Sequence, residues 1–178
     1  GPVYRKNPQK IMDDYSRFSQ YAEGAGKNEM TILWGSMYGM TAKATEYAEG
    51  ILQREGIQYN KLQMPLESES EMVATIFKSA GVIIAAPTYE YKLFPPVAEA
   101  LNEVGRKKIT GKAAFRFGSY GWSGGAENEL KEINERNRMK WDFVESVEFE
   151  GEPKEEDLKK VEAGILELIK KMKEKIVE

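Results

Sequence analysis

The chain has 178 residues, of which 41% are hydrophobic and 31% charged, and its formal net charge is −3. This size and composition are ordinary for one globular domain with its own core, and the acidic balance argues against a nucleic-acid binder, which needs a concentrated basic face. The sequence contains no cysteine and no histidine, which excludes disulfides, iron–sulfur clusters, thiolate zinc sites and catalysis by an imidazole. Any chemistry is therefore expected to come from a bound cofactor.

No segment approaches the ~20 consecutive apolar residues of a membrane span, and no signal-peptide pattern is present. We therefore expect a cytoplasmic protein without membrane partners. The first residues, Gly1 and Pro2, resemble the remnant of an expression tag because no initiating methionine precedes them. The natural chain is expected to extend further toward its N-terminus.

Hydrophobic spacing predicts an amphipathic helix over residues 9–23, and a glycine-containing linker follows at 24–28. From residue 30 onward, short apolar runs alternate with stretches of helical period. The expected strands lie at 30–34, 57–63, 81–86, 113–117 and 141–149. The expected helices lie at 44–55, 72–77, 95–104, 127–138 and 158–176.

This strict alternation of strands and helices predicts an α/β fold with a doubly wound, five-stranded parallel sheet of order 2-1-3-4-5. Residues 1–29 are expected to form a tag remnant and connector, and residues 30–178 a single domain. In such a sheet, ligands bind beyond the carboxyl ends of the strands, near the point where the strand order reverses. The loops after the first, third and fourth strands therefore form the candidate site.

The loop after the first strand contains Ser36, Met37, Tyr38, Gly39, Met40 and Thr41. Its hydroxyl groups, its glycine and the backbone N–H groups at the start of a helix predict a phosphate cradle. The same residues would also suit an ordinary turn with Thr41 as the helix N-cap. Neither a P-loop nor a Gly-x-Gly-x-x-Gly motif is present, which disfavours a nucleoside triphosphate or a dinucleotide as the ligand.

The loop after the third strand contains Pro87, Thr88, Tyr89, Glu90 and Tyr91. Its aromatic residues suit contact with a flat ring better than they suit a solvated turn. Phe94, slightly further along, is expected instead to fold back onto the sheet.

The loop after the fourth strand contains Ser119, Tyr120, Gly121, Trp122, Ser123 and Gly124. A tryptophan among glycines has no obvious core to join, so Trp122 is expected to stack on a planar ligand, with a lone surface aromatic as the alternative. Together the three loops describe a ligand with a phosphate at one end and a wide apolar ring at the other. FMN is the simplest molecule of that shape.

A family resemblance rests on these same residues. Segment 36–41 resembles the phosphate loop of flavodoxins, which carries a hydroxyl residue at both ends. Segments 87–89 and 117–125 resemble the C-terminal flavodoxin-like domain of flavodiiron proteins, and the run Gly-Ser-Tyr-Gly-Trp-Ser-Gly is the most specific part. The resemblance covers roughly residues 30–171 and implies a flavodoxin-like fold.

The resemblance also implies roles for the loops. Residues 36–41 would hold the FMN phosphate, 87–91 would border the ring, and 119–124 would line its other side. Residues 90–92 depart from the family pattern, which more often has small amide residues and a glycine there. No residue of this chain is expected to be catalytic or to bind metal.

In this family, an N-terminal metallo-β-lactamase-like domain holds a diiron site that reduces dioxygen or nitric oxide, and the flavodoxin-like domain supplies its electrons. The resemblance therefore implies an electron-transfer domain that is an oxidoreductase only within the full-length protein. A rubredoxin-like protein or a flavin reductase would be the electron donor, and the full-length protein would be a homodimer or homotetramer. Residues 3–29 would connect to the missing domain, and their helix would be a docking surface.

Two other functions are open at this point. A free-standing flavodoxin would carry electrons by diffusion, but flavodoxins normally begin close to their first strand. An FMN-dependent NAD(P)H:quinone reductase would be an enzyme in its own right, but such enzymes tend to carry insertions that this chain lacks. A binding module without a cofactor would leave Trp122 and the glycine-rich loop without a purpose.

Overall fold

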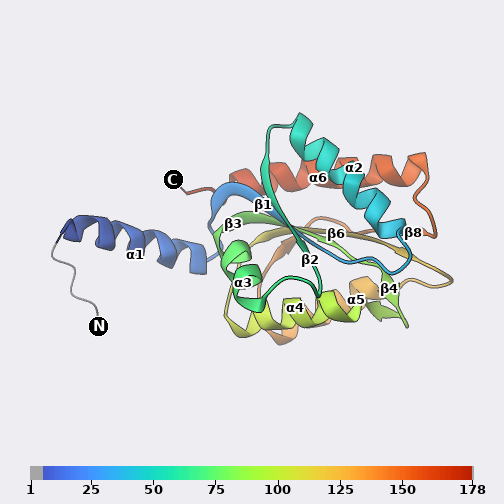
Figure 1. Ribbon diagram of the computed structural model, residues 1–178, viewed down its shortest axis with the longest axis horizontal. Helices are drawn as coiled ribbons and strands as arrows, with labels where there is room; N and C mark the ends of the chain where they lie inside the picture. The colour runs from blue at the N-terminus through green and yellow to red at the C-terminus, as the bar shows by residue number, and fades with distance from the viewer. Residues whose placement is uncertain (1–5, 178) are drawn as a thin grey trace.

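The computed structural model describes residues 6–177 and consists of a central sheet between two layers of helices (Figure 1). The expected tag remnant, Gly1 and Pro2, lies outside the described residues. The sheet runs in the order β2 (Gln58–Gln63), β1 (Lys27–Trp34), β3 (Ser79–Ala85), β6 (Ala113–Tyr120) and β7 (Asp142–Phe143), and β8 (Val147–Glu150) also pairs with β6. All of these pairs are parallel. The predicted doubly wound sheet of order 2-1-3-4-5 is confirmed.

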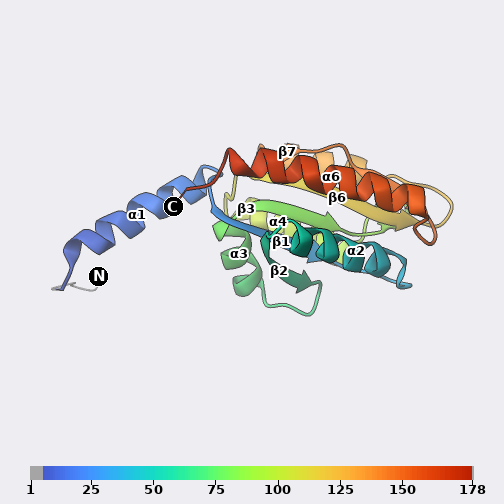
Figure 2. The ribbon, with the colours of Figure 1, turned by 90° about the horizontal axis from the view of Figure 1, so that it is seen from above.

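The helices cover the sheet on both faces, as right-handed crossovers between parallel strands require. One face is covered by α2 (Met40–Arg54) and α6 (Glu155–Lys173), and the other by α3 (Glu69–Lys78), α4 (Pro95–Arg106) and α5 (Ala126–Arg136) (Figures 1 and 2). The central strand β3 is buried along its whole length. Two apolar clusters therefore form the core, one on each side of the sheet.

Strand alternation decides which side chains join which cluster. On β6, Phe115 and Phe117 pack on the α2–α6 side, whereas Ala114 packs on the α3–α5 side. Because successive side chains of a strand point to opposite faces, Arg116 also points to the α3–α5 side. Its side chain is fully buried there.

The predicted fifth strand over 141–149 is wrong as one continuous element, because the structure divides it into β7 and β8. Phe143 pairs with Ala114 and Val147 with Phe117, so the four residue steps from 143 to 147 lie opposite only three steps, from 114 to 117, on β6. The extra residue forms a bulge that interrupts the ladder. The structure also adds an unpredicted antiparallel hairpin of β4 (Thr88–Tyr89) and β5 (Lys92–Leu93). In addition, β1 begins at Lys27, three residues before the expected start.

The N-terminal helix α1 (Pro8–Ala22) extends away from the body of the domain (Figures 1 and 2). Its C-terminal part is anchored by buried Tyr21 and by Phe18, whose ring centroids lie 5.8 and 6.3 Å from that of Phe77. Met12 and Tyr15 on the same helix are exposed. Its use as a connector and docking surface stays a prediction. None of the helices within residues 6–177 has the length and apolar character needed to cross a bilayer.

Candidate cofactor site

The loop between β1 and α2 presents a helix N-terminus at the carboxyl edge of the sheet. Gly39, with φ of 84°, is the N-cap, so the alternative with Thr41 as N-cap is wrong. The Ser36 hydroxyl accepts a hydrogen bond from the Gly39 N–H at 3.1 Å. The first three amide groups of α2 donate to no protein acceptor among the described residues. Free N–H groups at the positive end of a helix dipole form a site for an oxyanion.

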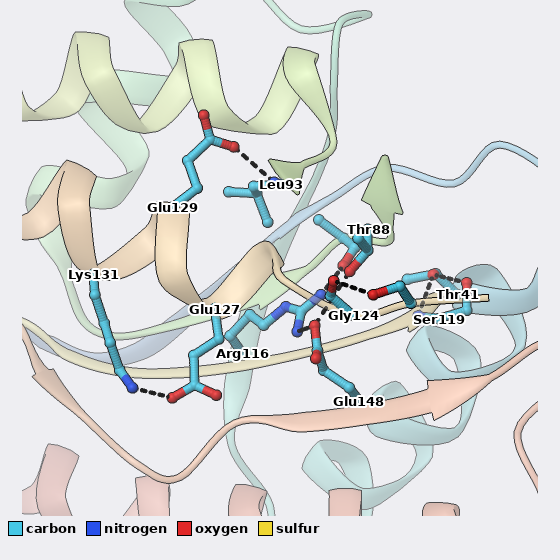
Figure 3. Close-up of polar contacts among 12 residues, drawn as sticks. Thr41, Thr88, Leu93, Arg116, Ser119, Gly124, Glu127, Glu129, Lys131 and Glu148 are labelled. Atoms are coloured by element: carbon cyan, nitrogen blue, oxygen red, sulfur yellow. Dashed lines mark hydrogen bonds and ion pairs between the residues drawn. The ribbon is translucent and has the colours of Figure 1, made fainter. Parts of the chain in front are cut away.

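The end of β6 includes Ser119 and Tyr120, which were predicted to lie in the following loop, and it is linked to the β1–α2 loop by Thr41. The Thr41 side chain is fully buried, and its hydroxyl oxygen lies 3.0 Å from the Ser119 hydroxyl oxygen (Figure 3). It also accepts a hydrogen bond from the Ser119 backbone N–H at 3.2 Å. Where Ser119 donates both bonds, the Thr41 hydroxyl keeps its own proton for a further acceptor.

The loop after β3 is the β4–β5 hairpin, and residues 90–92, which depart from the family pattern, lie at its turn. Glu90 and Tyr91 have positive φ values of 47° and 65°, a conformation that asparagine and glycine adopt at lower cost. The Leu93 N–H at the base of the hairpin donates to the Glu129 carboxylate at 2.7 Å (Figure 3). Phe94 packs against the core, as predicted, while Tyr89 and Tyr91 are exposed.

The last part of β6 lies close against the end of β3. A Cβ atom added at Gly118 would overlap the Ala86 carbonyl oxygen, so only glycine allows the two backbones to approach this closely. Beyond it, Trp122 is 86% exposed. The indole therefore does not pack in the core of the domain, in agreement with the expectation that it contacts a ligand or another protein.

The three loops enclose a pocket of about 500 Å³, a volume within the usual range for small-molecule sites. It is lined by Met37, Tyr38, Met40, Pro87, Thr88, Tyr89, Glu90, Tyr91, Ser119, Tyr120, Gly121, Trp122, Ser123 and Gly151. Most of the predicted site residues are thus brought together. The exceptions are Ser36, Gly39, Thr41 and Gly124, which do not line this pocket, and Gly151 is an addition.

A second depression of about 610 Å³ lies against the other side of the hairpin. Charged and amide side chains line much of it, among them Glu99, Asn102, Arg106 and Arg136. It suits a flat apolar ring less well than the pocket between the loops does.

An ion pair between a buried arginine and a partly buried glutamate, which the sequence does not predict, lies below the pocket. The Arg116 guanidinium lies 2.6 Å from the Glu148 carboxylate and donates to the Ala86 carbonyl at 2.9 Å. Burial lowers the pKa of Arg116, and the charge and hydrogen bond of Glu148 act in the opposite direction. The sequence does show a single arginine within the apolar run of the fourth strand, which indicates a buried charge. Its partner could not be identified because Glu148 lies 32 residues away along the chain.

These residues fit a ligand that carries a phosphate and a flat ring. The free amide groups of α2 suit the phosphate, and the exposed tyrosines and tryptophan suit the ring. Across residues 6–177, histidine, cysteine, aspartate and glutamate side chains nowhere gather in threes as a metal site.

No established protein-family model matches the chain. Among curated proteins, it is 27% identical over 132 residues to a nitric oxide reductase of Moorella thermoacetica, covering 74% of this chain and 32% of that protein. It is 29% identical over 132 residues to the anaerobic nitric oxide reductase flavorubredoxin of Vibrio vulnificus, covering 73% of this chain and 26% of that protein. The chain thus spans about a quarter to a third of the length of these relatives.

Among solved structures, a flavodiiron protein of Thermotoga maritima superposes with a TM-score of 0.80 and 26% identity, covering 97% of this chain and 42% of that one. An archaeal flavodoxin superposes with a TM-score of 0.68 and 18% identity, covering 82% of this chain and 99% of that one. The fold and the site therefore define a flavodoxin-like α/β domain. Its relatives are flavodiiron proteins, and the chain matches their flavodoxin-like part. The similarity to a flavodoxin and to flavodiiron proteins supports FMN, the cofactor that the sequence predicts.

Proposed function

We propose that this chain is the FMN-binding electron-transfer domain of a flavodiiron oxygen or nitric oxide reductase. The observation that carries the proposal is the pocket between the three loops, with unpaired amide groups at one end and exposed aromatic side chains along its walls. Bound FMN would supply the redox chemistry, and the protein would supply binding, orientation and local charge.

The chain's own residues would divide the work of binding. Residues 36–41 would hold the phosphate through backbone N–H groups and hydroxyls, without a positively charged side chain. Residues 87–91 and 119–124 would border the two sides of the ring. The exposed rings of Trp122 and Tyr89 would exclude water from the flavin and stack on it.

The partners belong to the same proposal. The electrons would come from a rubredoxin-like protein or a flavin reductase and pass to a diiron site on a metallo-β-lactamase-like domain outside this chain. The full-length protein would be a cytoplasmic homodimer or homotetramer. Support comes from the names of the relatives, which include a nitric oxide reductase and a flavorubredoxin.

A free-standing flavodoxin is the second candidate, because the archaeal flavodoxin is matched over 99% of its length. The gene separates the two candidates. A metallo-β-lactamase-like segment in the same reading frame supports the flavodiiron proposal, and its absence from the complete gene contradicts it.

Cofactor binding is tested on the purified chain after removal of any bound flavin. The protein is mixed with equimolar FMN, FAD or riboflavin and passed over a gel-filtration column, and the released ligand is identified by mass spectrometry. We expect one FMN per chain, with FAD and riboflavin largely lost on the column. Retention of FAD in preference to FMN, or of no flavin, would contradict the proposal.

A further inference from the structure

The ion pair of Arg116 and Glu148 lies where the ring-binding loops meet the sheet. The Arg116 side chain is fully buried and that of Glu148 is 23% exposed. Arg116 comes from β6 and Glu148 from β8, and both point toward the start of α5 (Figure 3). The pair is thus positioned beneath the loop that precedes α5.

Glu148 contacts both loops that border the predicted ring site. Its Oε1 accepts hydrogen bonds from Arg116 at 2.6 Å and from the Thr88 hydroxyl at 3.2 Å (Figure 3). Its Oε2 packs so closely against Gly124 that a Cβ atom added there would overlap it. Thr88 lines the pocket, and Gly124 follows the lining residues of the third loop. A single carboxylate therefore lies between the two loops and contacts both.

Arg116 links Glu148 to the end of β3. Its Nη2 donates to the Ala86 carbonyl at 2.9 Å, at the point where β3 gives way to the hairpin loop. Its Nε atom is buried and has no hydrogen-bond partner among the described residues. A buried charged group with an unpaired N–H lowers the free energy of unfolding. Stability alone therefore does not explain why an arginine occupies this position.

Glu148 is the main negative charge next to this arginine. Glu127, on the first turn of α5, also faces Arg116, but its carboxylate pairs with Lys131 at 2.6 Å (Figure 3). Removal of the Glu148 charge would therefore leave a nearly uncompensated positive charge under the pocket. A positive charge beside a flavin favours its reduced form, because reduction adds negative charge to the ring.

We propose that Arg116 and Glu148 are positioning residues for the cofactor pocket, where the pair fixes the spacing of the two ring loops and balances the charge beneath the flavin. This inference rests on the proposed binding of FMN. It assigns two separable tasks to Glu148. The length of its side chain decides the geometry of the loops, and its charge decides the electrostatic potential at the cofactor.

Two variants of Glu148 separate these tasks. Glu148→Asp keeps the charge and shortens the reach, so FMN affinity should fall about tenfold, as expected for loss of a charged hydrogen bond, while the midpoint potential stays close to that of the wild type. Glu148→Gln keeps the reach and removes the charge, so the midpoint potential should shift to a more positive value with a smaller loss of affinity. Glu127→Gln is the matched control, since it removes the other carboxylate that faces Arg116, a carboxylate with no hydrogen bond to either loop among the described residues, and its shift should be well below that of Glu148→Gln.

The measurements are FMN affinity by quenching of flavin fluorescence, midpoint potential by titration against a reference dye, and thermal unfolding of the flavin-free proteins. A wild-type chain that binds no FMN would overturn the proposed function together with this inference. A wild-type chain that binds FMN, with an unchanged potential in Glu148→Gln, would overturn this inference alone. The same holds if the Asp and Gln variants lose stability and affinity equally with no difference in potential, because the pair would then serve the fold only.

Discussion

The hydroxyl oxygens of Thr41 and Ser119 lie 3.0 Å apart, which joins the first turn of α2 to the end of β6 at the carboxyl edge of the sheet. Thr41 is the second residue of α2 and is fully buried, whereas Ser119 lines the pocket. A residue predicted to hold the phosphate is therefore in direct contact with one predicted to line the ring. A substitution at either hydroxyl is expected to alter binding of both the phosphate and the ring.

Replacement of Thr41 by valine tests the phosphate role of this hydroxyl. A hydrogen bond to a charged group contributes about 1.5–3 kcal/mol, so FMN affinity should fall roughly ten- to a hundredfold, while riboflavin, which has no phosphate, should lose less. Thr45→Val is the matched control, because the Thr45 hydroxyl donates within α2 to the Thr41 carbonyl at 2.8 Å. Equal losses for FMN and riboflavin would show that Thr41 serves only to join the two loops.

Replacement of Trp122 by alanine tests the stacking role of the most exposed aromatic side chain of the pocket. Aromatic stacking contributes about 0.5–1.5 kcal/mol beyond burial, so FMN affinity should fall about tenfold and the fluorescence of the bound flavin should rise. Tyr15→Ala, which removes another highly exposed aromatic side chain, on α1, should leave both quantities unchanged. If Trp122→Ala also leaves affinity, fluorescence and potential unchanged, the indole belongs to a protein interface.

The burial of Lys112 leads us to expect that the free energy of unfolding depends on pH. The side chain is fully buried, and its ammonium donates to the carbonyl oxygens of Tyr21, Ala25 and Phe77 at 3.4, 2.6 and 2.9 Å. Burial, with a smaller effect from the charge of Lys175, lowers the pKa of Lys112 from 10.5 to about 7. Between these values the unfolded chain binds the extra proton, so the free energy of unfolding should rise with pH by at most ~1.4 kcal/mol per unit.

Urea unfolding at pH 7, 8 and 9 measures this contribution. The increase should be present in the wild type, absent in Lys112→Met, and retained in Lys27→Met, which changes an exposed lysine of β1. Below about pH 7 both states carry the proton, so the difference in slope between wild type and Lys112→Met should vanish. Equal slopes from pH 7 to 9 would mean that the folded lysine titrates at its ordinary pKa.

The isolated chain is expected to hold no stoichiometric iron and to show no diiron-type reduction of dioxygen or nitric oxide. The sequence contains no histidine, and a diiron site of this family uses imidazole together with carboxylate ligands. Iron analysis after anaerobic incubation with ferrous iron and gel filtration checks this expectation. One or two iron atoms retained per chain would refute it, whereas slow oxidation of the reduced flavin by air would not.

The order of the parallel sheet followed from the sequence alone, and so did the loops between which the pocket lies. Both depend on local periodicity and on the fixed handedness of β–α–β crossovers, which short segments already express. The aromatic and glycine-rich loops were also recognisable, because side chains such as Trp122 had no periodic pattern that would place them in the core.

The tertiary structure alone decided which polar groups meet inside the domain. The bond between Thr41 and Ser119 spans 78 positions, and the pair of Arg116 and Glu148 spans 32, so their contact depends on strand register and on which face each side chain takes. The bulge that divides the last strand arises from a mismatch in residue count against β6. The burial of Lys112 likewise depends on packing between α1, α3 and β6, because desolvation is a property of the assembled neighbours and not of the lysine itself.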